Sequence, residues 1–210
     1  MVVFTSSLAV FGQDPAGPLL RTVGGDTLPR PQSSYGSQKF VGEMLVAEYS
    51  RRNYIRGRSV RLMTVSVRAG APSAAASSFL SGIIREPFAG LRSVCPVPKE
   101  TPVALSSPSN TIEGILRAAV SDETSWGSRT AMNLPALTAT PREMVEALEE
   151  VAPGSATLID WELDDEVIDI VTTWPAHFST KRAEALGLQT NASFREIVED
   201  YVGSRKEAIA

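Results

Sequence analysis

The sequence predicts an α/β protein built on a parallel β-sheet. Residues 2–6 and 60–67 are β-branched, largely apolar stretches, typical of strands that are covered on both faces. Between them lies an amphipathic segment, which predicts a helix from Ser33 or Ser34 to about Arg52. A strand, a crossover helix and a second strand form a βαβ unit, in which the two strands run parallel.

A glycine- and proline-rich loop at 12–32 precedes the first helix, and the remaining elements follow the second strand. The clearest helix is 140–152, because Thr140 can cap it, Pro141 suits its first turn and Glu143 completes a capping box. We expect further helices at 73–88 (stopped by Pro87), 107–120, 164–174, 179–187 and 193–208, and short strands at 92–97, 102–107, 130–135 and 157–163.

Composition excludes several classes of function. The 210 residues, 43% hydrophobic and 21% charged, are enough for one large or two small globular domains. A net charge of −4 argues against a protein that grips nucleic acid. A single cysteine, Cys95, excludes an internal disulfide and a CxxC metal site and suits a reducing cytoplasm. His177 is the only histidine, and no apolar run reaches the length of a membrane span, so we expect no metal site and no membrane partner.

Four polar residues can converge at one edge of the predicted sheet. Ser6 and Ser7 lie where the first strand gives way to its loop, at the carboxyl edge where open α/β sheets bind ligands. Tyr35 and Lys39 stand one turn apart at the start of the following helix, so they share a helix face. A lysine ammonium beside a tyrosine stabilises the phenolate, and such a tyrosine can take and return a proton near neutral pH.

With these motifs the sequence resembles the extended branch of the short-chain dehydrogenase/reductase superfamily, the NAD-dependent epimerase/dehydratase family. "FTSSLAVFG" resembles the serine strand of that branch, and "SSYGSQK" resembles its catalytic helix. The long segment "TVSVRAGAPSAAASSFLSGIIREPFAG" resembles the group of dehydrogenases that act on D-erythronate, a four-carbon sugar acid.

The resemblance implies a fold and its domains. Residues 1–70 would be the C-terminal half of a dinucleotide-binding, Rossmann-like, doubly wound parallel sheet. Residues 71–210 would form a smaller mixed α/β substrate-binding region, with 103–135 returning to the Rossmann part. A homodimer through the YxxxK helix is also implied, with Phe40, Met44 and Leu45 as interface candidates, although core packing explains those residues equally well.

The resemblance also implies roles for particular residues. Tyr35 would be the general acid/base, Lys39 would assist it and bind the nicotinamide ribose, and Ser7 would hold the reacting oxygen. The cofactor would be NAD, which carries the hydride chemistry while the protein manages the proton. Further candidates for the cofactor are Ser6, Thr64 and Val65, and for the substrate Ser77, Ser78 and Arg85, with Arg68, Ser106 and Ser107 as weaker candidates.

The glycine-rich turn that such enzymes use for the pyrophosphate has no counterpart in this sequence. The sequence begins where the fifth sheet strand of the family would begin, so we expect an incomplete domain with an exposed edge strand. The isolated chain should therefore bind NAD poorly and be marginally stable.

Three functions stay open at this point. The leading one is an NAD-dependent oxidoreductase that acts on a secondary alcohol or ketone of a small sugar acid. A nucleotide-sugar epimerase or dehydratase would use the same serine, tyrosine and lysine. The third is a truncated, non-catalytic remnant that only binds a partner. The choice between NAD and NADP depends on a region that this sequence lacks.

Overall fold

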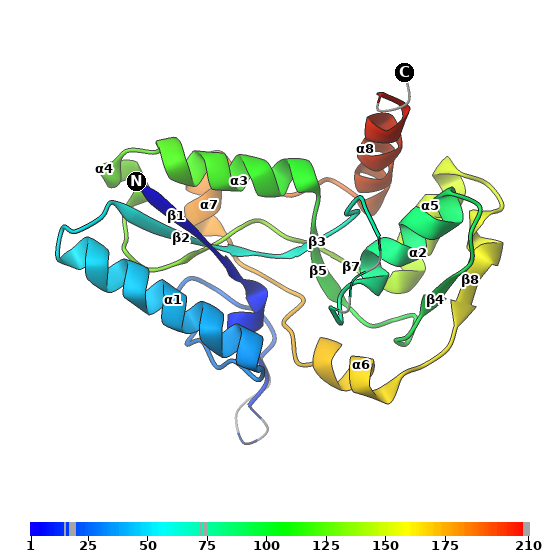
Figure 1. Cartoon of the computed structure of the whole chain (residues 1–210), viewed down its shortest axis with the longest axis horizontal. Coiled ribbons are helices and arrows are strands. Elements are labelled where there is room, and N and C mark those ends of the chain that lie inside the picture. Colours follow the sequence, from blue (N-terminus) through cyan, green and yellow to red (C-terminus); the bar gives the residue numbers. More distant parts are fainter. Residues whose placement is uncertain (15, 17–19, 72, 74, 208–210) are drawn as a thin grey trace. The chain divides into compact units, whose positions relative to one another are not determined.

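The computed structural model describes residues 1–14, 16, 20–71, 73 and 75–207 (Figure 1). Helices alternate with short, mostly parallel strands, which confirms the predicted α/β class. The chain forms two compact units, each drawn from several segments. The first unit contains 1–63, 109–136 and 173–190, and the second contains 64–108, 137–172 and the segment from 191 onward.

A three-stranded parallel sheet organises the first unit. Its strands are β1 (Val2–Ser7), β2 (Gly57–Leu62) and β6 (Met132–Asn133), in the order β1-β2-β6. The pairing of β1 with β2 runs from Val2 opposite Gly57 to Ser7 opposite Leu62. Within the described residues β1 is therefore an edge strand, and Val2 is 42% exposed.

Helices cover both faces of this sheet. The helices of the unit are α1 (Ser34–Arg51), α3 (Pro108–Val120), α4 (Glu123–Trp126) and α7 (Lys181–Ala185), with a 3₁₀ turn at Leu8–Val10. Val60 of β2 packs in a core cluster with Ala118 of α3, whereas the neighbouring Arg61 reaches Glu43 of α1. Since successive side chains of a strand point to opposite faces, α1 and α3 lie on opposite sides of the sheet, as Figure 1 shows.

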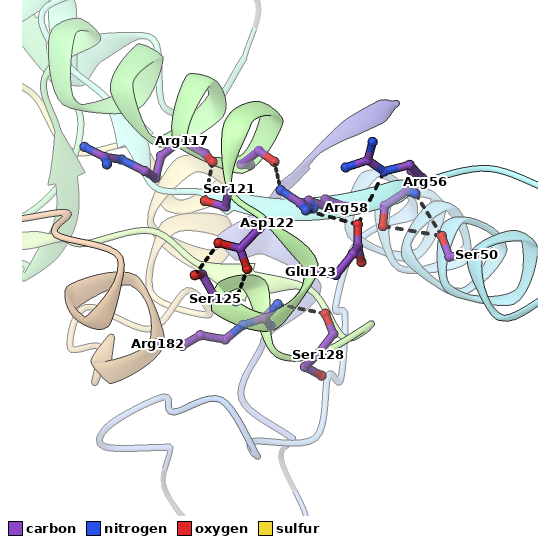
Figure 2. A network of polar contacts seen from close by, with 12 residues as sticks. Ser50, Arg56, Arg58, Arg117, Ser121, Asp122, Glu123, Ser125, Ser128 and Arg182 are labelled. Atoms are coloured by element: carbon purple, nitrogen blue, oxygen red, sulfur yellow. Dashed lines mark hydrogen bonds and ion pairs between the residues drawn. The ribbon is translucent and has the colours of Figure 1, made fainter. Parts of the chain in front are cut away.

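Two arginines, the buried Arg58 and the half-buried Arg182, bind groups near the end of the sheet at which β2 begins (Figure 2). Arg58 donates to the carbonyl oxygen of Ala118 at 2.6 Å and pairs with Glu123 at 3.2 Å. Arg182 donates to the carbonyl oxygen of Trp126, the last residue of α4, and to those of Ser128 and Thr130 in the loop that follows. Burial, together with the nearby cations Arg58 and Arg61, lowers the pKa of Arg182 to about 10.

The second unit has two small sheets. β3 (Thr64–Val65) runs parallel to β5 (Val103–Ser106), which pairs antiparallel with β7 (Leu137–Ala139), and β4 (Ser93–Cys95) runs parallel to β8 (Ile159–Trp161). Its helices are α2 (Phe79–Phe88), α5 (Pro141–Val151), α6 (Asp165–Val171) and α8 (Phe194–Glu207), with a 3₁₀ turn at Ser155–Leu158. The capping box predicted for Thr140 and Glu143 is present at the start of α5.

Several predicted boundaries were wrong. The strand expected at 60–67 is two strands, because β2 ends opposite the last residue of β1 and Thr64 pairs with Leu105 in another sheet. The helix expected at 73–88 begins at Phe79, because residues 75–78 form a turn; residue 74 lies outside the described residues. α4 and β7 were not predicted. The first compact unit ends at Met63 and takes in 173–190; the functional division into 1–70 and 71–210 stays a prediction.

None of the helices in the described part of the chain is both long enough and apolar enough to cross a bilayer.

The single thiol gives a stability prediction. Cys95 is fully buried at the end of β4, and burial raises the pKa of its thiol from 9.0 to about 11. The folded state therefore prefers the protonated thiol, and this stability is present below pH 9 and lost as the pH rises toward 11. We expect the free energy of unfolding to fall by up to about 2 kcal/mol over that range because of this thiol.

Urea unfolding at pH 8 and at pH 11 measures this dependence. Tyrosines and lysines also titrate in this range, so the Cys95→Ala variant is the reference that isolates the thiol. An equal pH dependence in the variant and the native chain would contradict the prediction.

Candidate active site

The two serines at the end of β1 have different environments. Ser6 is 2% exposed, and its hydroxyl donates to Oε1 of Glu43 at 2.5 Å. Ser7 is the last residue of β1 and is half-buried; its Oγ accepts from the backbone N–H of Ala9 at 3.2 Å and so caps the 3₁₀ turn. Ser7 is thus the serine with access to a ligand at the carboxyl edge of the sheet.

The tyrosine and the lysine lie in the first turns of α1. Ser33 caps this helix, because its hydroxyl accepts from the backbone N–H of Gly36 at 3.1 Å. Tyr35 is 54% exposed. The Nζ of Lys39 donates to the carbonyl oxygen of Thr5 at 2.7 Å and lies 5.6 Å from the centre of the Tyr35 ring. The amine is therefore held between the strand that carries the serines and the phenol.

A glycine lets the start of α1 approach the segment that follows Ser7. A Cβ on Gly36 would lie 2.0 Å from the carbonyl oxygen of Ala9, a distance that no side chain tolerates against backbone. The first turn of α1 therefore packs directly on the 3₁₀ turn that Ser7 caps. The turn that carries Tyr35 therefore lies against the segment that Ser7 caps, although no hydrogen bond joins Ser7 to Tyr35 within the described residues.

The remaining candidates belong to the second unit. Thr64 and Val65 form β3, opposite Leu105 and Ser106 of β5. Ser77 is half-buried in the turn before α2.

Arg85 and Ser78 both have internal partners. The guanidinium of Arg85, which is 8% exposed as a residue, donates to the carbonyl oxygen of Arg68 at 3.0 Å and to Glu86 at 2.5 Å. The Ser78 hydroxyl accepts from Ser73. An incoming carboxylate would therefore compete with Glu86 for Arg85.

Sequence reasoning missed two charged residues beside this site. Glu43 lies one turn beyond Lys39 in α1, and Arg61 is the last residue but one of the buried strand β2; both are 5% exposed and they form a bidentate ion pair. A signal was present, since an arginine inside an apolar strand and a glutamate on the inner face of a helix each require a partner. No group of three or more metal-ligating side chains occurs in the part of the chain that the structure describes.

Comparisons with known proteins show which proteins this chain resembles. Residues 1–95 match the model of the NAD dependent epimerase/dehydratase family. The chain is 47% identical to a D-erythronate dehydrogenase of Cupriavidus necator over 96% of its own length and 61% of that protein. It is 37% identical to a D-erythronate dehydrogenase of Haemophilus influenzae over 95% of its length and 62% of that protein.

A solved structure gives the same picture. The nucleoside-diphosphate-sugar epimerase from Agrobacterium tumefaciens superposes with a TM-score of 0.87 at 38% identity, and the match covers 96% of this chain and 59% of that one. The chain thus spans about three fifths of the length of the relatives that it matches. Residues 1–95 thus match the NAD-dependent epimerase/dehydratase family, and nearly the whole chain is similar to the two dehydrogenases in sequence and to the epimerase in sequence and fold.

Proposed function

We propose that the chain carries the acid–base residues of an NAD-dependent dehydrogenase, which exchange a proton with the substrate hydroxyl. The substrate is a secondary alcohol of a small sugar acid such as D-erythronate. One observation carries the proposal: the Lys39 amine is held between the carbonyl oxygen of Thr5 and the ring of Tyr35, at the edge where β1 ends. A cation beside a solvent-accessible phenol stabilises the phenolate, and a phenol that loses and regains a proton can act as general acid/base on an alcohol.

Each of the three residues has a distinct role in this proposal. Tyr35 takes the proton of the substrate hydroxyl during oxidation and returns it during reduction. Lys39 stabilises the phenolate that forms after proton transfer. The hydroxyl of Ser7 donates a hydrogen bond to the substrate oxygen and orients it toward Tyr35.

The donor set of Lys39 suits the ribose of a nicotinamide cofactor. An ammonium group has three N–H donors, and Thr5 accepts from one of them, which leaves donors for ribose hydroxyls. The bound nicotinamide would supply the hydride chemistry. Thr64 and Val65 are proposed as the residues that contact its carboxamide; Ser6, whose hydroxyl bonds Glu43, would act only through the backbone or that bond.

Further contacts with the sugar acid are proposed for residues of the second unit. Ser77, Ser78 and Arg85 are proposed to bind the hydroxyls and carboxylate of the substrate, because a guanidinium pairs with a carboxylate through two parallel hydrogen bonds. For Arg85 this requires release of the side-chain contact with Glu86.

We further propose that two chains associate through α1. Met44 and Leu45 are 57% and 56% exposed, and Val41 extends the same apolar surface at 58%. Phe40 contributes less than the other two candidates, since it packs against a core cluster of Val10, Phe11 and Val23. Sedimentation of the native chain beside a Met44→Glu variant would reveal such a dimer.

The test of the proposed activity is formation of NADH from D-erythronate and NAD, followed by absorbance. We expect NADH to form in proportion to the D-erythronate supplied. NAD is supplied at millimolar concentrations. No NADH under these conditions would contradict the proposal, and interconversion of nucleotide sugars instead would assign an epimerase, the activity named for the relative from Agrobacterium tumefaciens.

A further inference from the structure

The face of α1 that meets the sheet contains an ion pair. Glu43 accepts from Nε of Arg61 at 2.8 Å and from Nη2 at 2.6 Å, and it also accepts from the Ser6 hydroxyl at 2.5 Å. Both charged side chains are about 95% buried. Glu43 therefore ties α1 to β1 through Ser6 and to β2 through Arg61.

The pair continues toward the third strand of the sheet. Nη1 of Arg61 reaches Oδ1 of Asn133 in β6 at 3.4 Å, and Nδ2 of Asn133 donates to the carbonyl oxygen of Gly24 at 3.2 Å. The guanidinium also lies over the Phe11 ring, 4.7 Å from its centre. Since Arg61 is held on every side, Glu43 meets a rigid partner.

Stability alone does not explain a pair of this kind. Burial of two charges carries a desolvation cost, and apolar residues of similar volume are often as stabilising or more so. A bidentate pair does, however, fix both distance and direction, which apolar contacts do not. The geometry of the pair is therefore its distinctive contribution.

Other contacts also hold α1 on the first unit: Phe40 packs against the Phe11 cluster, Gly42 lies against the Phe4 ring, and the Ser50 hydroxyl accepts from the backbone N–H of Gly57. Gly36 and Glu43 are its only buried residues among those described, and the large apolar residues Val41, Met44 and Leu45 face outward. A glycine permits close approach but does not specify how far a helix slides along a strand. Glu43 differs from the other contacts because it bonds β1 and β2 at the same time, through Ser6 and Arg61.

Lys39 lies one turn before Glu43 on the same face of α1. Fixing Glu43 against Ser6 therefore also fixes the height of Lys39 above Thr5, the residue next to Ser6.

We infer that Glu43 and Arg61 are positioning residues: their buried pair sets α1 on the sheet so that the Lys39 amine stays on the carbonyl oxygen of Thr5, beside Tyr35. The consequence for turnover rests on the proposed function, but the position of the amine does not.

The experiment measures that position through the chemical reactivity of the Lys39 amine. The whole chain is pulsed with a water-soluble acylating reagent, and acylation of each lysine is read by peptide mass spectrometry, with Lys99 and Lys181 as internal references. Glu43→Gln keeps the shape of the side chain and removes its charge. Glu48→Gln is the matched control, since Glu48 lies on the same helix and pairs only with Arg51 and Arg52 at the surface.

We expect the Lys39 amine to react about fivefold faster in Glu43→Gln than in the native chain, because the net free energy of about one hydrogen bond that holds α1 in place is lost. Its rate of acylation should be unchanged in Glu48→Gln. The far-ultraviolet circular dichroism of Glu43→Gln should match that of the native chain. If NADH formation is measurable, its kcat should fall while KM for the sugar acid stays constant, and Glu43→Asp should recover part of the loss.

Unchanged Lys39 reactivity in folded Glu43→Gln would overturn the inference. If that variant does not fold, Arg61→Lys, which keeps both charges and loses the bidentate contact, replaces it. Failure of both variants to fold would make the pair a folding requirement and would also overturn the inference. Increased reactivity without NADH formation in any chain would support the positioning role and contradict the proposed function.

Discussion

Replacing Tyr35 with phenylalanine is expected to lower the kcat for NADH formation by about 10³-fold and to leave the fold intact. The substitution removes only the phenolic oxygen, and general acid–base groups contribute factors of this order. The side chain is 54% exposed, so its hydroxyl supports no core contact. Steady-state kinetics with D-erythronate measures the loss, and circular dichroism verifies the fold.

The control for this substitution is Tyr49→Phe. Tyr49 lies on the same helix, is 50% exposed and stacks edge-on against Tyr54 at 5.8 Å, away from Lys39. Its turnover should stay within about twofold of the native value, as for most surface substitutions. Full NADH formation by Tyr35→Phe would contradict the catalytic role of Tyr35.

Replacing Gly36 with alanine should damage both stability and turnover. The new methyl group would lie 2.0 Å from the carbonyl oxygen of Ala9, and backbone cannot yield as a flexible side chain does. We expect a loss of about 3 kcal/mol in the free energy of unfolding, the upper end for an overpacked site. Since α1 must lift away from the turn that follows Ser7, turnover should fall about 10²-fold in the fraction that folds.

The same substitution at Gly203 is the control. Gly203 is exposed, lies in α8, and a Cβ there meets nothing within 4 Å. Gly203→Ala should be neutral or slightly stabilising, because alanine favours the helix by about 1 kcal/mol over glycine. Urea unfolding compares the two variants with the native chain. Equal stability of Gly36→Ala and the native chain would show that the two backbones are not in close contact.

Local signals in the sequence predicted much of the architecture. The βαβ unit, the cap at Ser33 and the capping box at Thr140 follow from patterns a few residues long, and all are present. Helix α4 carried such a signal too: Asp122 caps it and Gly127 ends it in a left-handed conformation, although four residues are too few for a periodic pattern.

Pairing between distant segments could not be read from the sequence. Residues 60–67 look like one strand, and their division at Met63 depends on which distant strands lie opposite, Ser7 for Leu62 and Leu105 for Thr64. The same holds for Glu43 and Arg61, which meet through space. A candidate site built from Ser7, Tyr35 and Lys39 was within reach because its residues lie near the start of one βαβ unit. The pairing of Glu43 with Arg61 could not be predicted, because the sequence does not show which charged residue lies opposite each of them.

The two compact units alternate along the chain, starting with the crossing after Met63 between β2 and β3, and this limits how the protein can be handled. The backbone passes between the two compact units five times, at 63/64, 108/109, 136/137, 172/173 and 190/191. No single cut releases either unit as one continuous polypeptide, so neither can be expressed alone by simple truncation. Protease digestion should therefore yield nested fragments that remain associated. Refolding from urea should be slow, since contacts between remote segments must form before either unit is complete.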